Sequence, residues 1–209
     1  MTAPDHESPG PTGAGTTLEG ALQRIDADLT RARVAFALIG GLAVSARTEP
    51  RFTRDADLAV AVANDAEAEA LVQTLRWLDY RIESVVEQEA AGRLATVRVV
   101  RSRAPRAPVV DLLFASSGIE PEIVTEAEVL ELLPRLSMRV ATTGHLIALK
   151  VLSRDDVTRP QDLVDLRALL RVASEADLDR AQRALTLIAA RGFHRGRDLI
   201  ADMNGLLRT

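Results

Sequence analysis

The sequence predicts an α+β fold, in which a mixed β-sheet with flanking helices is followed by a helical C-terminal module. Two observations carry this prediction. Between residues 18 and 140, short apolar runs typical of strands alternate with amphipathic segments, and beyond a change in composition near residue 141 only helical periodicity is found. A chain of 209 residues suits one domain with a smaller helical appendage, and its 3% aromatic content means that aliphatic side chains must form the core.

Each element follows from a local pattern. Apolar residues recur at helical spacing from Leu18 to Leu29, which predicts an amphipathic helix. The run "VAFALI" ends in two glycines, which indicates a buried strand that leads into a turn. Asn64 suits the N-cap of the helix that follows it. In chain order, helices are predicted at 18–32, 42–46, 64–78, 142–153, 160–171, 177–191 and 196–207, and strands at 34–39, 56–62, 80–88, 93–100 and 109–114.

Composition excludes several classes of protein. Residues 1–17 have neither a basic start nor an apolar segment, so they are no secretory signal, and their Pro, Gly, Ser and Thr content predicts a disordered tail. The expected divisions are therefore this tail, a core at 18–140 and a helical module at 141–209. The absence of cysteine excludes disulfides and thiolate chemistry. No apolar stretch approaches the ~20 residues of a membrane-spanning helix, so we expect a cytoplasmic protein. A net charge of −4 argues against a protein that coats nucleic acid without sequence preference.

A double glycine and two closely spaced aspartates stand at the ends of two predicted strands. Gly40-Gly41 alone could be an ordinary tight turn, and Asp55 and Asp57 alone could be solvated charges. Side chains alternate faces along a strand, so the two aspartates point the same way and lie ~6.6 Å apart along the chain. Like charges at that distance resist joint ionisation in an apolar core, so they require water or a cation.

Asp111 is a third carboxylate in an unexpected place, because apolar residues flank it on both sides. If the strand at 109–114 pairs beside the strand at 56–62, about 4.8 Å away, the side chains of Asp55, Asp57 and Asp111 converge. Three carboxylates on a rigid sheet suit Mg²⁺, which keeps water and substrate phosphates as its other ligands. Two such ions about 3.5–4 Å apart can activate an attacking hydroxyl and stabilise a leaving pyrophosphate. Gly40 and Gly41 would then let backbone amides approach a triphosphate, with a further contact from the Ser45 hydroxyl.

Lys150 is the single lysine among 26 basic residues, and it falls in an apolar helix. Asp162 and Asp165 share a face of the next predicted helix. The residues leave two interpretations open at this point. Lys150 could contact triphosphate oxygens while Asp162 orients it, or the lysine and the aspartates could form a salt bridge between two helices.

Together these motifs resemble the DNA polymerase β-like nucleotidyltransferase superfamily, whose signature is a strand, Gly-Gly or Gly-Ser, a spacer, Asp-x-Asp and a later acid. Here the spacer is 13 residues (42–54), and the lead-in "RFTRDADL" is similar to that of bacterial members. Lys150, Arg154 and the segment "DLVDL" resemble the later motifs of AbiEii-type nucleotidyltransferases, the toxins of type IV toxin–antitoxin pairs. The resemblance implies that Lys150 binds nucleotide and that Asp162 acts beside it. Gln161 stands where members often have a lysine.

The resemblance implies an enzyme that moves a nucleoside monophosphate from an NTP to an acceptor hydroxyl with two Mg²⁺ ions. The acceptor would be RNA, such as a tRNA end, or a protein, with a cognate antitoxin as a further partner. A small antibiotic is an alternative acceptor, and a nucleotide-binding or toxin-partner module without catalysis is an alternative function. The arginine run from Arg93 to Arg106 could grip RNA, although such a run is more often a solvated hairpin, and "RGFHRGR" at 191–197 is a second, weaker basic segment.

Overall fold

The computed structural model describes residues 17–51, 53–88, 92–101, 107–155 and 157–208. The predicted tail lies outside the described residues except for Thr17, which caps the first helix by accepting a hydrogen bond from the Gly20 amide. In chain order the elements are α1 (Leu18–Arg31), β1 (Ala35–Ile39), α2 (Gly40–Arg47), β2 (Ala56–Ala61), α3 (Asp65–Trp77), β3 (Arg81–Gln88), β4 (Arg93–Val100), β5 (Val110–Leu113), α4 (Glu120–Glu126), β6 (Glu128–Leu133), β7 (Leu136–Val140), α5 (Thr143–Ser153), α6 (Pro160–Val172), α7 (Glu175–Ala190) and α8 (Leu199–Leu207).

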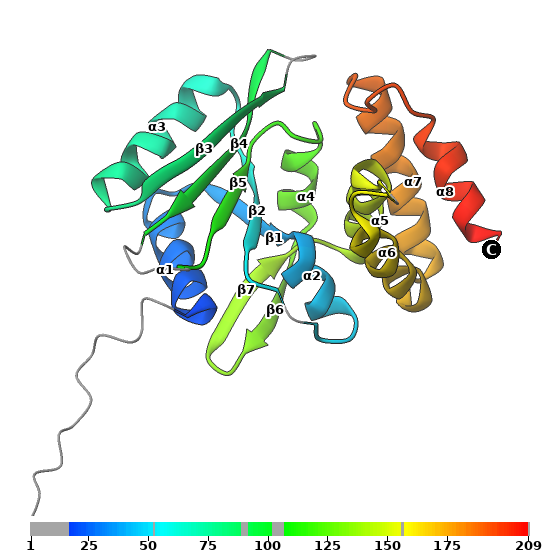
Figure 1. Ribbon diagram of the computed structural model, residues 1–209, viewed down its shortest axis with the longest axis horizontal. Coiled ribbons are helices and arrows are strands. Elements are labelled where there is room, and N and C mark those ends of the chain that lie inside the picture. The colour runs from blue at the N-terminus through cyan, green and yellow to red at the C-terminus, as the bar shows by residue number, and fades with distance from the viewer. Residues whose placement is uncertain (1–16, 52, 89–91, 102–106, 156, 209) are drawn as a thin grey trace, which may run out of the picture.

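Within the described residues, the strands form one mixed sheet in the order β3-β4-β5-β2-β1-β7-β6. β2 runs antiparallel to β1 and parallel to β5, whereas β1 runs parallel to β7. β1 and β2 lie in the middle of the sheet and are almost wholly buried, which explains why their sequences are continuous apolar runs. The predicted mixed sheet with flanking helices is confirmed (Figure 1).

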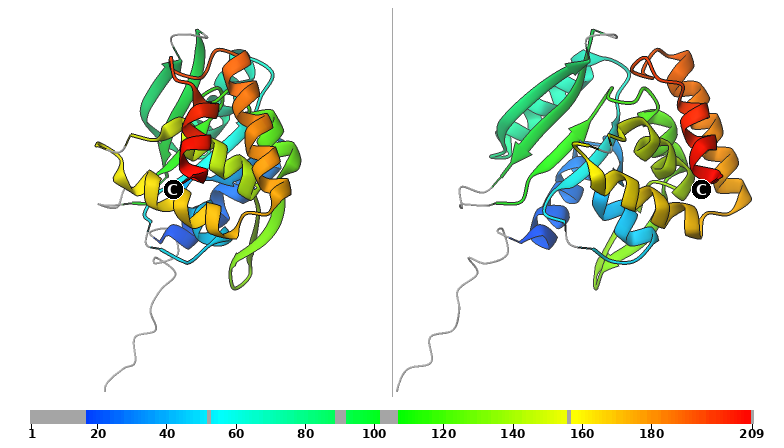
Figure 2. Two further views of the ribbon diagram at one scale, coloured as in Figure 1. Left: turned by 90° about the vertical axis from the view of Figure 1, so that its right-hand side faces the viewer. Right: turned by 45° about the vertical axis from the view of Figure 1, so that its right-hand side comes forward.

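Some helices pack against the sheet, and the helices at the C-terminal end pack mainly against one another. α4 contacts β1 and β2, and α1 contacts β1 and β7. Figure 1 and the right view of Figure 2 show α5, α6, α7 and α8 as one group beside the sheet. α2 contacts β1 and β2 as well as α5 and α6, so it joins the sheet to that group. Within the described residues, no helix combines the length and the apolar character that crossing a bilayer requires.

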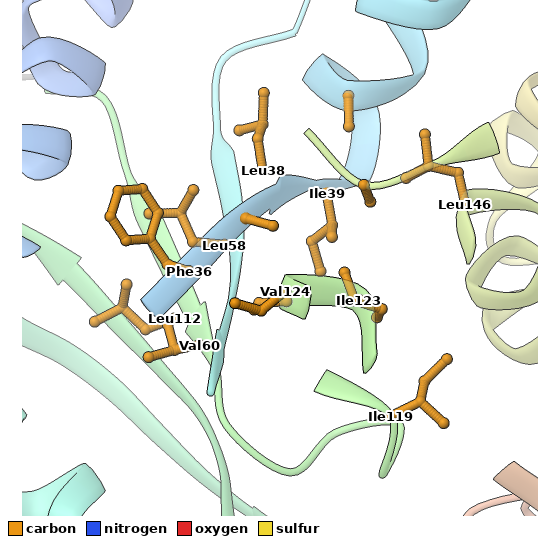
Figure 3. Close-up of a cluster of buried hydrophobic side chains, with 14 of the residues drawn as sticks. Phe36, Leu38, Ile39, Leu58, Val60, Leu112, Ile119, Ile123, Val124 and Leu146 are labelled. Carbon is orange, nitrogen blue, oxygen red and sulfur yellow. The ribbon is translucent and has the colours of Figure 1, made fainter. Parts of the chain in front are cut away.

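One apolar core runs through the described residues. Its central part is formed by side chains of β1, β2, β5 and α4 together with Leu146 of α5 (Figure 3). The same cluster continues into α6, α7 and α8 through residues such as Leu166, Ile188 and Met203. Because apolar packing crosses residue 140 without a break, the division into a core and a helical module stays a prediction.

Residues 115–140 contain three elements that the sequence does not predict, namely α4, β6 and β7. β6 and β7 form a hairpin whose two-residue turn, Pro134-Arg135, contains no glycine or asparagine, and Arg135 adopts a left-handed conformation with φ 69°. Such turns normally require Gly, Asn or Asp, so the usual hairpin signal is missing. In α4 the carboxylate of Glu120 is buried and accepts hydrogen bonds from Ser116 and Ser117. The amino-acid composition of this segment does not indicate that a charged residue is buried there.

Candidate active site

The carboxylates of Asp57 and Asp111 lie side by side on neighbouring strands. β2 and β5 pair in parallel with Asp57 opposite Asp111, so the strand pairing on which the sequence prediction depends is present. Asp55 stands just before β2, two residues from Asp57. All three aspartates line one cavity of about 760 Å³ between the sheet and helices α2, α5 and α6. The fold therefore places three carboxylates at one wall of a cavity large enough for a nucleotide.

Asp57 is electrostatically strained in this position. The pKa of its carboxyl is raised to about 6, first by burial and then by the negative charges of Asp111 and Asp55, while Lys150 and Arg159 act in the opposite direction. Among the described residues, Lys150 and Arg159 offset this effect only in part, so an ionised carboxylate in this position favours further positive charge nearby. A divalent cation would remove the repulsion, and carboxylate oxygens are the donors that Mg²⁺ prefers, so the residues present fit that ion.

Arg98 of β4 already holds Asp111. The two residues face each other in the antiparallel register of β4 and β5. The Arg98 Nε donates to Oδ1 of Asp111 at 2.8 Å, and Nη2 donates to Oδ2 at 2.7 Å. Both Asp111 oxygens are thus engaged by a guanidinium group where a metal ion would bind, and the described residues contain no group of three acids or histidines arranged as a ready metal site. The Arg98 side chain is 44% exposed, so this ion pair lies at the open side of the carboxylate wall.

The glycine pair touches the carboxylate wall. Gly40 has φ 64°, and a Cβ atom at that position would lie 1.9 Å from Oδ2 of Asp57. A Cβ atom on Gly41 would lie 2.6 Å from Nη2 of Arg51. The absence of a Cβ atom at Gly40 and Gly41 therefore leaves the space that the side chains of Asp57 and Arg51 occupy. Gly40 and Gly41 also line the cavity as the first residues of α2, which has no side-chain N-cap, so the predicted contact of their amides with a triphosphate stays a prediction.

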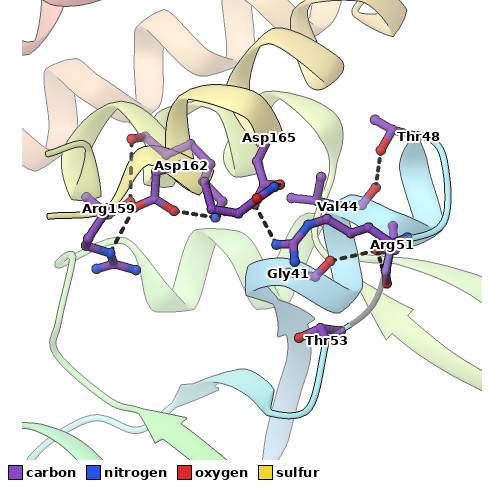
Figure 4. Close-up of polar contacts among 12 residues, drawn as sticks. Gly41, Val44, Thr48, Arg51, Thr53, Arg159, Asp162 and Asp165 are labelled. Carbon is purple, nitrogen blue, oxygen red and sulfur yellow. Dashed lines mark hydrogen bonds and ion pairs between the residues drawn. The ribbon is translucent and has the colours of Figure 1, made fainter. Parts of the chain in front are cut away.

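Lys150 belongs to a network of charged side chains, of which Figure 4 labels Arg51, Arg159, Asp162 and Asp165. Its Nζ is 2.6 Å from Oδ1 of Asp162 and 2.8 Å from Oδ2 of Asp165, and the lysine is only 9% exposed. Arg51 adds a 2.7 Å ion pair to Asp165, and Arg159 adds a 3.1 Å ion pair to Asp162. The salt bridge between two helices that the sequence left open is thus present, and it lies at the wall of the same cavity.

Comparison with known proteins identifies the family. The model of the nucleotidyl transferase AbiEii toxin of type IV toxin–antitoxin systems matches residues 22–209. This chain belongs to the AbiEii family. It is accordingly a nucleotidyltransferase, as the motifs around Gly40 and Asp57 predict. No curated protein sequence matches it.

Solved structures agree with the AbiEii fold. An antigenic nucleotidyltransferase-like protein from Paracoccidioides brasiliensis shares 19% identity at a TM-score of 0.51, with 88% of this chain and 90% of that chain covered. ANT(2″)-Ia in complex with adenylyl-2″-tobramycin shares 14% identity at a TM-score of 0.51, with 82% of this chain and 96% of that chain covered. At such identities the likeness shows the fold alone.

Ser45 lies within α2, one turn after the glycine pair of this AbiEii protein. The sequence assigns its hydroxyl to the triphosphate, but the structure places Ser45 outside the residues that line the cavity. Its Oγ donates to the Gly41 carbonyl at 3.1 Å and accepts from the Arg51 amide at 3.3 Å. The hydroxyl therefore fixes the segment that follows α2, and its predicted contact with a triphosphate stays a prediction.

Arg98 is the site residue that the sequence reasoning missed in this AbiEii protein. Arg98 belongs to the basic run from Arg93 to Arg106, but it also interrupts the apolar strand "ATVRVV" with a charge. A charge inside an apolar strand is the same signal that singles out Asp111. The other described arginines of the run are also paired with acids, Arg93 with Asp65 and Arg101 with Asp28. Arg103 and Arg106 lie outside the described residues.

The Gly40→Ala substitution tests the contact between the AbiEii glycine pair and the carboxylates. The left-handed backbone and the clash with Asp57 should together lower the free energy of unfolding by roughly 2–5 kcal/mol. Gly192→Ala is the matched control, because Gly192 has φ 84° but nothing lies within 4 Å of a Cβ there, so only the backbone cost of about 1–2 kcal/mol applies. Urea denaturation measures both, and equal losses would show that Asp57 does not occupy the space above Gly40.

Proposed function

We propose that this protein transfers a nucleoside monophosphate from an NTP to an acceptor hydroxyl in a Mg²⁺-dependent reaction. The observation that supports this most strongly is the register of Asp57 with Asp111 at the wall of the cavity, with Gly40 packed against Asp57. Asp55, Asp57 and Asp111 would hold two Mg²⁺ ions, which would supply positive charge at the α-phosphate and at the leaving pyrophosphate.

The protein's own residues would share the remaining work. Asp111, once released by Arg98, would accept the proton of the acceptor hydroxyl as its oxygen bonds to the α-phosphorus. The bond from the α-phosphorus to the bridging oxygen breaks, and pyrophosphate leaves. The amides of Gly40 and Gly41 would contact the triphosphate at the start of α2. Lys150, held by Asp162, would add positive charge behind it.

The family supplies the biological setting of the proposal. AbiEii proteins are described as toxins of type IV toxin–antitoxin systems, so we propose a cytoplasmic toxin with a cognate antitoxin. The acceptor in this proposal is RNA, such as a tRNA end, or a protein side chain. Transfer to either would inactivate a component that growth requires.

A second candidate is transfer to a small antibiotic. It is favoured by the fold likeness to ANT(2″)-Ia, whose structure holds adenylyl-2″-tobramycin. A third candidate, a nucleotide-binding or toxin-partner module without catalysis, is disfavoured because all three carboxylates are present and line one cavity.

Labelled transfer separates these candidates. Each of the four NTPs, labelled at the α-phosphate, is incubated with the protein and Mg²⁺ in the presence of total RNA, total protein or tobramycin. We expect label in RNA or protein, and none when EDTA is present. Label in tobramycin alone would establish the second candidate, and nucleotide binding without any transfer would establish the third.

A further inference from the structure

The basic segment 191–197 between α7 and α8 reaches the active-site cavity. Arg195 lines the cavity together with the carboxylates of Asp55, Asp57 and Asp111, although it comes from the far end of the chain. Arg195 adopts φ 56°, and the next residue, Gly196, has φ 72°. A residue with a side chain rarely adopts this left-handed conformation, and such strain is concentrated at functional sites.

Arg197 fixes this segment against α5. Its Nη1 donates to the carbonyl oxygens of Leu152 and Arg154, each at 3.2 Å, and its Nη2 is 2.6 Å from Oδ2 of Asp202. The last carbonyls of α5 are thereby satisfied by a side chain from the α7–α8 segment. Because Arg197 is held on both sides, the backbone two residues earlier is positioned, and Arg195 is presented to the cavity.

Arginine side chains, more than Lys150, provide the positive charge that a ligand in the cavity can reach. Lys150 is buried, and its ammonium group is bound to Asp162 and Asp165. Arg159 also pairs with Asp162, but its side chain is 59% exposed, which leaves most of its five donors accessible. Among the described residues Arg195 forms no ion pair, and its neighbours Arg159 and Arg197 carry the same charge. Partial burial, followed by these two arginines, lowers the pKa of Arg195.

The cavity is lined by carboxylates on the sheet side, where Arg98 pairs with Asp111, and by arginines on the helical side, where Arg159 pairs with Asp162. Asp55, Asp57 and Asp111 lie on the sheet side, and Arg159 and Arg195 lie on the helical side. A polyphosphate that shares metal ions with carboxylates needs cations on its other side. Arg159 and Arg195 line the same cavity as the three carboxylates, so a polyphosphate bound there would meet both sets of side chains.

We propose that Arg159 and Arg195 form the binding site for the β- and γ-phosphates of the nucleotide, with Lys150, held by Asp162, as a buried positive charge behind them. This inference rests on the proposed function. Guanidinium groups suit the role because each offers two parallel donors to a phosphate. The strained backbone at Arg195 is then the structural cost of aiming this side chain into the cavity.

Binding of inorganic tripolyphosphate with Mg²⁺, followed by isothermal titration calorimetry, tests the proposal without requiring transfer. Arg195→Gln and Arg159→Gln are each expected to weaken binding about 10-fold or more, which is the size expected for a lost charge-assisted hydrogen bond. Arg183→Gln removes the same charge from an exposed position on α7 outside the cavity, and it should change binding less than about 2-fold.

Arg195→Gly separates a binding role from a structural one. Glycine adopts the left-handed conformation without strain, so this variant should melt at the same temperature as the wild type or higher while losing tripolyphosphate binding like Arg195→Gln. Arg195→Lys should recover only part of the affinity. A lower melting temperature together with unchanged binding would overturn the proposal.

Two further results distinguish this inference from the proposed function. If Arg195→Gln weakens binding of a single-stranded RNA oligonucleotide but not of tripolyphosphate, the arginine pair serves the acceptor and the proposal is wrong. If transfer occurs with an unchanged KM for NTP in Arg195→Gln, the function holds and the inference fails. If no transfer is found with any acceptor but tripolyphosphate binding depends on Arg195, the inference holds and the function fails.

Discussion

Asp57→Asn is expected to reduce nucleotide transfer by about 10³-fold or more, because the amide can no longer share a divalent cation with Asp111. The substitution keeps the shape of the side chain, so Gly40 and β2 should remain in place. The measurement is the rate of labelled transfer at saturating NTP and Mg²⁺. Asp79→Asn is the control, since Asp79 is an exposed acid with φ 65°, a conformation that asparagine tolerates, and its activity should be unchanged.

The same variant should be more stable than the wild type when metal is absent. The pKa of Asp57 is raised from 3.8 to about 6 by folding, so its favourable contribution is present below about pH 4 and is lost as the pH rises through 6. At pH 7–8 in EDTA, Asp57→Asn should therefore raise the free energy of unfolding by roughly 1–3 kcal/mol, and the gain should vanish near pH 4. Mg²⁺ should stabilise the wild type but not the variant. A variant that is inactive and also less stable in EDTA at pH 8 would point to a folding defect instead.

Lys150→Met should produce the largest loss of stability, about 3–5 kcal/mol at pH 7, as is typical when one partner of a buried ion pair is removed. Methionine fills a similar volume, so the loss reflects charge. Asp162 and Asp165 would remain buried, with Arg159 and Arg51 as their only remaining cationic neighbours in the network. Urea denaturation measures the effect. The control, Arg81→Met, breaks an exposed pair with Glu83 and should cost no more than about 1 kcal/mol.

The pH dependence of this loss provides an independent check. Burial alone would raise the pKa of Asp165, but hydrogen bonds from Arg51, Lys150 and Gln161 together hold it below its ordinary value. The stability that these bonds contribute is present above pH 3.8 and is lost as the pH falls, because the protonated carboxyl no longer needs a cation. The difference between wild type and Lys150→Met should therefore shrink below pH 4. A difference that is constant from pH 8 to pH 3 would mean that packing, not charge, explains the loss.

The candidate site could be predicted from the sequence where a charge interrupts an apolar run. Strand alternation places Asp55 and Asp57 on one face, and the apolar flanks of Asp111 require a partner strand, which the structure supplies as β2. The β6–β7 hairpin could not be predicted because Arg135 replaces the usual glycine in its turn. The contact of Arg98 with Asp111 could not be predicted either, because it depends on the register of β4 with β5, and that register is set by tertiary pairing.

Arg195 was beyond prediction for a different reason. Its place in the cavity depends on Arg197 binding the end of α5, which is a contact between segments more than forty residues apart in the chain. No local pattern encodes it. Lys150 was ambiguous because the same residues suit a salt bridge and a phosphate contact, and only the burial of the lysine and its two close carboxylates show which contact the structure contains.

We propose that Asp57 and Asp111 jointly hold a divalent cation and that Arg98 occupies its place when the cation is absent. Crystals grown with Mn²⁺ and a non-hydrolysable NTP analogue test this directly, because Mn²⁺ is located by its anomalous scattering. We expect Mn²⁺ bound by carboxylate oxygens of both Asp57 and Asp111, with Arg98 no longer within hydrogen-bond distance of Asp111. A nucleotide seated in the cavity with no metal between these carboxylates, and with both Arg98 hydrogen bonds intact, would contradict the claim.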